Sequence, residues 1–133
     1  MNKLLILLLL VAVVAVAAWA FKQGGDDGFK TVSADEFEKL INGTSAIQVL
    51  DVRTQEEYAQ GHLPGALLID VKQTNFLDEA NGTLTHDYPV AVYCRSGRRS
   101  ANAARQLVKA GYVVTNLDGG ILAWQEQGKL VVK

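Results

Sequence analysis

The architecture of this chain is clearest in one run of residues, Val90-Ala91-Val92-Tyr93-Cys94-Arg95-Ser96-Gly97-Arg98-Arg99-Ser100. Its first four residues are apolar and predict a buried strand. Gly97 and three arginines then predict a loop rather than a continuation of that strand. Beyond the loop, apolar residues recur on one helical face as far as Ala110, so we expect Ser100 to cap a helix that Gly111 ends. A strand that leads through a short loop into a helix is typical of α/β proteins.

The same alternation of apolar and amphipathic stretches extends to both sides of this run. Capping boxes at 33–36 and 54–57, helical spacing over 121–127, and apolar runs at 46–52, 66–69 and 112–117 predict three further helices and three further strands. Residues 72–89 show no clear pattern, and Asn-Gly pairs at 42–43 and 81–82 are interpreted as turns. Strands interleaved with helices favour an α/β fold, with a central parallel sheet of about five short strands and helices on both faces.

Composition limits the possible functions. The 133 residues suit one domain, and 13 basic against 14 acidic side chains leave a net charge of −1. Generic nucleic-acid binding through a basic surface is therefore not expected. Cys94 is the one cysteine, which excludes an internal disulfide, and no Cys and His cluster has zinc spacing, so no metal site is predicted.

The N-terminus has the features of a targeting segment. Lys3 precedes an unbroken apolar run over residues 4–21, which ends in the small-x-small pattern of a cleavage site. At about 1.5 Å per residue, a helix of this length also nearly spans a bilayer of about 30 Å. Residues 1–21 are thus a signal peptide or a signal anchor, 22–28 a flexible linker and 29–133 the functional domain. We expect export to the periplasm or cell envelope, with the domain either released or anchored by residues 4–21, and we expect a monomer.

The chemistry is expected at Cys94, where three physical effects converge. A helix N-terminus favours a thiolate, Gly97 allows a loop with inward-facing N–H groups, and three arginines (Arg95, Arg98 and Arg99) add positive charge. Each effect should lower the pKa of the thiol from its reference value of about 8.5. From the residues alone, the alternative is that Cys94 is simply a small buried apolar side chain.

At these residues the chain resembles the rhodanese-like sulfurtransferases. Residues 94–99 are similar to the six-residue active-site loop of that family, Cys-x-x-Gly-x-Arg. The resemblance also includes Asp51-Val52-Arg53, Glu57-Tyr58 and residues 61–66, which match a first signature, and Asp118-Gly119-Gly120 with Ala123-Trp124 and Gly128, which match a last one. It covers residues 29–128 and implies a single-domain rhodanese-like fold, similar to the exported bacterial proteins.

The resemblance implies a persulfide mechanism. Cys94 would take sulfane sulfur from thiosulfate or a similar anionic donor and pass it to cyanide or a thiol acceptor, without a metal or organic cofactor. The loop residues Arg95, Ser96, Gly97, Arg98, Arg99 and Ser100 would bind the donor and the persulfide, although capping is the preferred role for Ser100. Asp51 and Arg53 would organise the loop, unless they form an ordinary salt bridge.

Two other functions follow from the same residues. A Cys-based phosphatase is disfavoured because Arg99 lies five positions after Cys94 rather than six, and Tyr93 stands where such enzymes usually have His. A persulfide carrier without turnover, or a protein-interaction module of the same fold, stays open. His62 and His86 are interpreted as structural, and Trp124 as part of the core.

Overall fold

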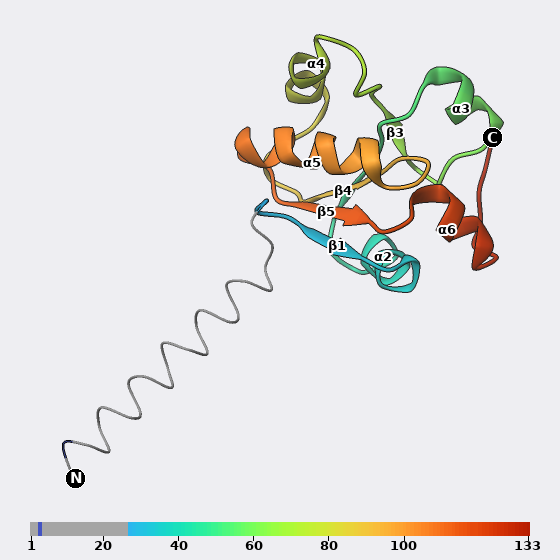
Figure 1. Ribbon diagram of the computed structural model, residues 1–133, viewed down its shortest axis with the longest axis horizontal. Coiled ribbons are helices and arrows are strands. Elements are labelled where there is room, and N and C mark those ends of the chain that lie inside the picture. The colour runs from blue at the N-terminus through green and yellow to red at the C-terminus, as the bar shows by residue number, and fades with distance from the viewer. Residues whose placement is uncertain (1–2, 4–26) are drawn as a thin grey trace.

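Five parallel strands form the centre of the computed structural model, which describes Lys3 and residues 27–133 (Figure 1). They run in the order β1-β5-β4-β2-β3, and every neighbouring pair is parallel. The strands are β1 (Lys30–Val32), β2 (Gln48–Asp51), β3 (Leu67–Leu68), β4 (Val90–Tyr93) and β5 (Val114–Leu117). All the carboxyl ends therefore lie at one edge of the sheet, where α/β proteins bind ligands. The predicted parallel α/β fold is confirmed.

Helices cover both faces of the sheet. They are α2 (Ala34–Ile41), α3 (Gln55–Gln60), α4 (Phe76–Thr83), α5 (Arg98–Lys109) and α6 (Gly120–Glu126). One apolar cluster joins the sheet to α4 and α5, and a second joins it to α2 and α6. β4 is apolar throughout because both of its faces are buried. Val90 and Val92 belong to the first cluster, whereas Ala91 and Tyr93 belong to the second.

The start of α5 differs from the sequence-based prediction. The helix begins at Arg98, and its N-cap is Gly97, which has a φ of 106°. Glycine adopts this left-handed conformation without the steric cost that other residues incur, so the chain enters the helix before it reaches Ser100. The prediction that Ser100 caps the helix is therefore wrong. Its buried hydroxyl turns back to the carbonyl of Gly97 and to Cys94.

The turn predicted at Asn81-Gly82 is also wrong, because both residues lie inside α4. Phe76 and Ala80 of this helix are buried in the core, and Tyr112 donates a hydrogen bond to Asn81 over 2.9 Å. Tertiary packing thus outweighs the local preference of Asn-Gly. Of the two capping boxes, that of Thr54 and Glu57 is complete, whereas at Ser33 the side chain accepts only the N–H of Glu36.

The predicted signal segment and most of the predicted linker fall on residues 1–2 and 4–26, outside the described part of the chain. Among the helices of the part that is described, none is both long and apolar enough to span a membrane.

Candidate active site

Cys94 follows β4 directly and lies at the carboxyl edge of the sheet. Its side chain is only 1% exposed, but the sulfur faces the loop that follows rather than the apolar interior alone. The N–H of Gly97 donates a hydrogen bond to Sγ over 3.0 Å, and the hydroxyl of Ser100 donates another over 3.3 Å. Sγ therefore lies within hydrogen-bond distance of the Gly97 amide and the Ser100 hydroxyl.

These donors control the ionisation of the thiol. Burial alone raises the pKa of Cys94, because a charged sulfur loses its hydration. Hydrogen bonds from the Ser100 hydroxyl and from the amides of Ser100, Gly97 and Ser96 act in the opposite direction and prevail, so the pKa is lowered overall. A sulfur with these partners is better suited to be a nucleophile than an inert core thiol.

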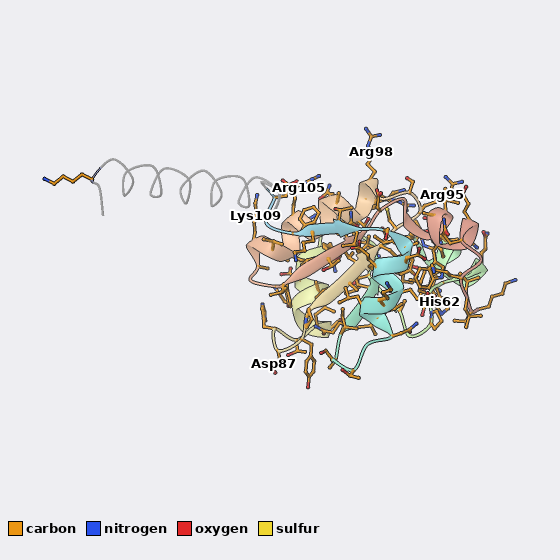
Figure 2. The ribbon with its side chains drawn as sticks, turned by 90° about the horizontal axis from the view of Figure 1, so that it is seen from below. His62, Asp87, Arg95, Arg98, Arg105 and Lys109 are labelled. Carbon is orange, nitrogen blue, oxygen red and sulfur yellow. The ribbon has the colours of Figure 1, made fainter. Side chains whose placement is uncertain are left out.

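The three loop arginines have different roles in the structure. Arg99 forms a two-pronged ion pair with Glu57 of α3, with N–O distances of 2.6 and 2.8 Å. Glu57 therefore compensates the positive charge that the sequence predicts Arg99 to add beside the sulfur. Arg95 and Arg98 are exposed, project from the surface in Figure 2, and form no ion pair with any residue in the described range.

Glu57 was visible in the sequence only as part of a capping box and of the family signature. The structure gives it a second task, because it binds Arg99 across 42 positions of the chain. The bond to Arg99 lowers the pKa of Glu57 from 4.5 to about 2. No local pattern could have revealed this contact.

The Glu57–Arg99 pair leads to a prediction about acid stability. Because the folded-state pKa of Glu57 is depressed, its contribution is complete above pH 4.5 and is lost as the pH falls toward 2. The pair is partly exposed, so solvent screening limits the contribution to about 1 kcal/mol. Urea unfolding at pH 7, 4 and 3 should show a smaller acid-induced loss in Glu57→Gln, which can still cap α3. Glu56→Gln, at an exposed position without a described ion pair, is the control and should behave like the wild type.

Beneath the loop lies a buried polar network that connects β2 with β4. Asp51 is fully buried and Arg53 is 5% exposed, and their ion pair has an N–O distance of 2.7 Å. The Tyr93 hydroxyl donates to the same Asp51 carboxylate over 2.7 Å and accepts the N–H of Leu63 over 3.0 Å. Burial and the Asp51 carboxylate raise the pKa of Tyr93, which keeps the hydroxyl protonated and able to donate.

This network does not touch Sγ in the described contacts, but it fixes the residue directly before Cys94. Arg53 also donates to the carbonyl of Gly61 over 2.7 Å, so the ion pair fastens the turn that follows α3 to the end of β2. The sequence left two roles open for Asp51 and Arg53. The structure shows the salt bridge, and it joins the pair to Tyr93, the residue before Cys94.

Comparison with known proteins agrees with this geometry. Residues 33–127 match the family model described as the rhodanese-like domain. The chain belongs to the rhodanese-like family. It is 36% identical over 107 residues to thiosulfate sulfurtransferase 18 of Arabidopsis thaliana, covering 71% of this chain and 79% of that protein. It is 33% identical over 102 residues to a sulfurtransferase of Allochromatium vinosum, covering 76% and 92% respectively. These relatives support sulfur transfer in general.

A solved structure supports the fold of this rhodanese-like domain. The crystal structure of a rhodanese-related protein from Thermoplasma volcanium superimposes with a TM-score of 0.69 at 32% identity. The match covers 78% of this chain and 98% of the other. The rhodanese-like α/β fold predicted from the sequence is thereby confirmed.

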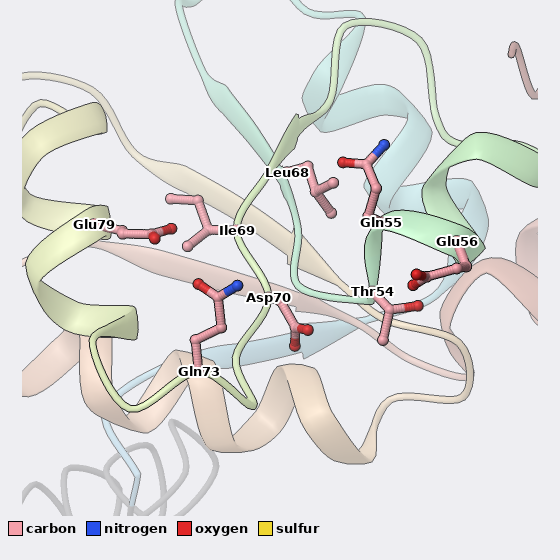
Figure 3. Close-up of a pocket in the computed structure, with 8 residues that line it drawn as sticks. All are labelled: Thr54, Gln55, Glu56, Leu68, Ile69, Asp70, Gln73 and Glu79. Carbon is pink, nitrogen blue, oxygen red and sulfur yellow. The ribbon is translucent and has the colours of Figure 1, made fainter.

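Two of the cavities that the described residues form at the carboxyl edge of this rhodanese-like sheet lie beside α3. The larger, about 390 Å³, is enclosed by the start of α3, the segment after β3, and α4, and it contains three carboxylates (Figure 3). The smaller, about 200 Å³, lies between α3 and α6 and is bordered by Arg95 of the loop. On charge, the smaller cavity suits an anion better, because it is bordered by Arg95, which forms no ion pair with the described residues, and because the carboxylate of Glu57 is bound to Arg99.

The two histidines have structural contacts. His62 stacks on Tyr58 with ring centroids 3.6 Å apart, and its Nδ1 lies 2.9 Å from the Tyr58 carbonyl. His86 stacks on Tyr112, and its Nε2 lies 2.9 Å from the carbonyl of Ala110. Trp124 is 2% exposed and belongs to the core, as predicted.

Proposed function

We propose that this domain is a thiosulfate sulfurtransferase that carries sulfane sulfur on Cys94. The proposal rests on one observation above all: Sγ is surrounded by hydrogen-bond donors of its own loop, which lower its pKa. Donors arranged in this way stabilise a thiolate, and they can equally stabilise the terminal sulfur of a persulfide. The relatives that carry the name sulfurtransferase provide the second line of support.

The reaction has two displacement steps. The Cys94 thiolate attacks the outer sulfur of thiosulfate; the new S–S bond forms as the bond to the sulfonate sulfur breaks, and its electron pair leaves with sulfite. Cyanide, or a thiolate acceptor, then attacks the outer sulfur of Cys94–S–S⁻. This step releases thiocyanate, or a persulfide, and restores the thiolate. Both steps are displacements at sulfur that need no external oxidant or reductant, so the proposed chemistry requires no cofactor.

The loop residues divide the remaining tasks. The amides of Ser96, Gly97 and Ser100 and the Ser100 hydroxyl hold negative charge on sulfur. Arg95 and Arg98 attract the dianionic donor and stabilise the sulfite that leaves, because their guanidinium groups are exposed beside the loop. Arg99 acts mainly through its bond to Glu57, which ties the first turn of α5 to α3.

A substitution at Ser100 tests the role of its hydroxyl. Ser100→Ala removes one donor to Sγ while leaving the backbone amides, so we expect the pKa of Cys94 to rise by about one unit. At a pH below the wild-type pKa of Cys94, persulfide formation in the variant should be roughly tenfold slower than in the wild type, because the thiolate fraction is smaller by that factor. Stopped-flow loading with thiosulfate across a pH series measures both quantities. In Ser45→Ala an exposed hydroxyl outside the loop is lost, and this control should load like the wild type.

The proposed intermediate can be observed directly. The purified protein is treated with thiosulfate, and the Cys94 peptide is analysed by mass spectrometry. A gain of one sulfur atom supports the proposal, whereas an unchanged peptide under conditions that load a known sulfurtransferase overturns it. Steady-state formation of thiocyanate from thiosulfate and cyanide then distinguishes an enzyme from a carrier. Fast loading with negligible turnover would identify a persulfide carrier.

We further propose that residues 1–21 export the domain to the cell envelope, where it is released or anchored by residues 4–21. The apolar run and its small-x-small end support export. Intact mass of the native protein, with cell fractionation, decides between release and anchoring, and full-length protein in the cytosol contradicts export.

A further inference from the structure

The first turn of α6 lies directly against the backbone of the Cys94 loop. The N–H of Ile121 donates to the carbonyl of Cys94 over 2.9 Å, and the N–H of Leu122 donates to the carbonyl of Arg95 over 3.1 Å. Gly120, with a φ of +60°, brings the two segments together. A Cβ at this position would lie 2.4 Å from the Arg95 oxygen and 2.5 Å from the Cys94 oxygen. No side chain fits there, and neither obstacle is a side chain that could rotate away.

This contact determines where the loop amides point. In a planar trans peptide the N–H points in the direction opposite to the C=O, and the chain contains no cis peptide within its described residues. When Leu122 holds the Arg95 carbonyl toward α6, the N–H of Ser96 must point away from α6. That amide is one of the groups that stabilise the Cys94 thiolate. The amide of Gly97, next along the chain, donates to Sγ over 3.0 Å.

We propose that Gly120 and the first turn of α6 are a positioning element of the active site: they hold the carbonyls of Cys94 and Arg95 toward α6, and the Arg95–Ser96 peptide plane thereby turns the Ser96 amide toward Sγ. Gly120 does not contact Sγ, and no contact with a bound sulfur donor is assigned to it. It acts by orienting the peptide planes of the loop. The expected effect on sulfur transfer rests on the proposed function, whereas the expected effect on the ionisation of the Cys94 thiol does not. A loop held in this way also needs no reorganisation when negative charge moves from Sγ of Cys94 to the outer sulfur of the persulfide.

The chain offers a matched control at the other end of the same helix. Gly128 follows α6 with a φ of +72°, close to that of Gly120, but a Cβ there would meet nothing within 4 Å. Alanine at either position suffers a similar backbone strain, since both residues are in the left-handed region. Only at 120 does the methyl group collide with the active-site loop.

The experiment compares Gly120→Ala with Gly128→Ala in the full chain. The pH dependence of alkylation by iodoacetamide reports the pKa of Cys94 without ambiguity, because the chain has one cysteine. In Gly120→Ala we expect this pKa to rise by about one unit and persulfide loading at saturating thiosulfate to slow by roughly 10- to 100-fold. In Gly128→Ala both should stay at wild-type values, even if the melting temperature falls. Equal behaviour of the two variants would overturn the proposal.

A second pair of variants covers the case in which Gly120→Ala does not fold. Leu122→Pro removes the N–H that holds the Arg95 carbonyl, and Leu122→Ala keeps it while trimming a side chain that is 42% exposed. The proposal requires a raised Cys94 pKa in the proline variant alone. An equal shift in both variants would instead assign the effect to the side chain and refute the positioning role. If the wild type loads no sulfur but the alkylation pKa shifts as described, the proposed function fails while the positioning element stands.

Discussion

Cys94→Ser is expected to reduce thiocyanate formation from thiosulfate and cyanide by at least about a thousandfold, to the level without protein. A serine hydroxyl is hardly ionised near neutral pH and cannot hold a transferable sulfur atom. The substitution nevertheless preserves the shape of the site, since the Gly97 amide and the Ser100 hydroxyl can donate to an oxygen in place of Sγ. The variant should therefore unfold in urea within about 1 kcal/mol of the wild type.

Cys94→Ala separates loss of the nucleophile from loss of the fold. It is equally inactive, but it leaves the Gly97 amide without its acceptor at a site that is 1% exposed, whereas the Ser100 hydroxyl can still donate to the Gly97 carbonyl. It should therefore be less stable than Cys94→Ser, by about 1–3 kcal/mol. Sulfur transfer that survives in Cys94→Ser would contradict the proposed mechanism as a whole, and equal stability of the two variants would contradict the hydrogen-bonded state of the sulfur.

The sequence predicted the features whose signals are local. The apolar run before Cys94 identified a strand buried on both faces, and Gly97 with the residues around it identified a loop that turns back toward the sulfur. Both are consequences of short-range preferences, namely apolar runs in parallel sheets and glycine in left-handed turns. The parallel sheet followed because strands and helices alternate along the chain.

Other features depend on contacts between distant parts of the chain. Serine is a common N-cap residue, yet the helix begins after Gly97, three positions before Ser100. Burial next to Sγ gives the Ser100 hydroxyl a different hydrogen-bond partner. The pair Asn81-Gly82 is typical of a turn, yet it lies inside α4, which packs into the core through Phe76 and Ala80. The compensation of Arg99 by Glu57, and the contact of Gly120 with the loop, require the tertiary fold. Local preferences are worth too little free energy to prevail over such packing.

Asp51→Ala is expected to have the largest effect on stability. The substitution leaves Arg53 charged and 5% exposed without its carboxylate, and breaking one partner out of a buried ion pair costs about 3–5 kcal/mol. It also removes the acceptor of the Tyr93 hydroxyl, so the end of β4 next to Cys94 loses its support. Urea unfolding at pH 7 measures the loss, and persulfide loading of the folded fraction should fall with it.

Asp35→Ala is the matched control, because it removes the carboxylate from an ion pair of nearly the same length. Asp35 lies 2.8 Å from Lys129, against 2.7 Å for Asp51 and Arg53, but the Asp35 side chain is 70% exposed, whereas that of Asp51 is fully buried. After Asp35 is removed, Lys129, whose side chain is 10% exposed, still pairs with Glu38 over 3.0 Å, so the loss should barely change the unfolding midpoint. Burial of the carboxylate and the partner left to the cation, rather than distance, then set the cost of losing a carboxylate. Equal shifts in the two variants would show that Arg53 finds solvent or another partner when Asp51 is absent, and that the network under the loop is not what holds β4 in place.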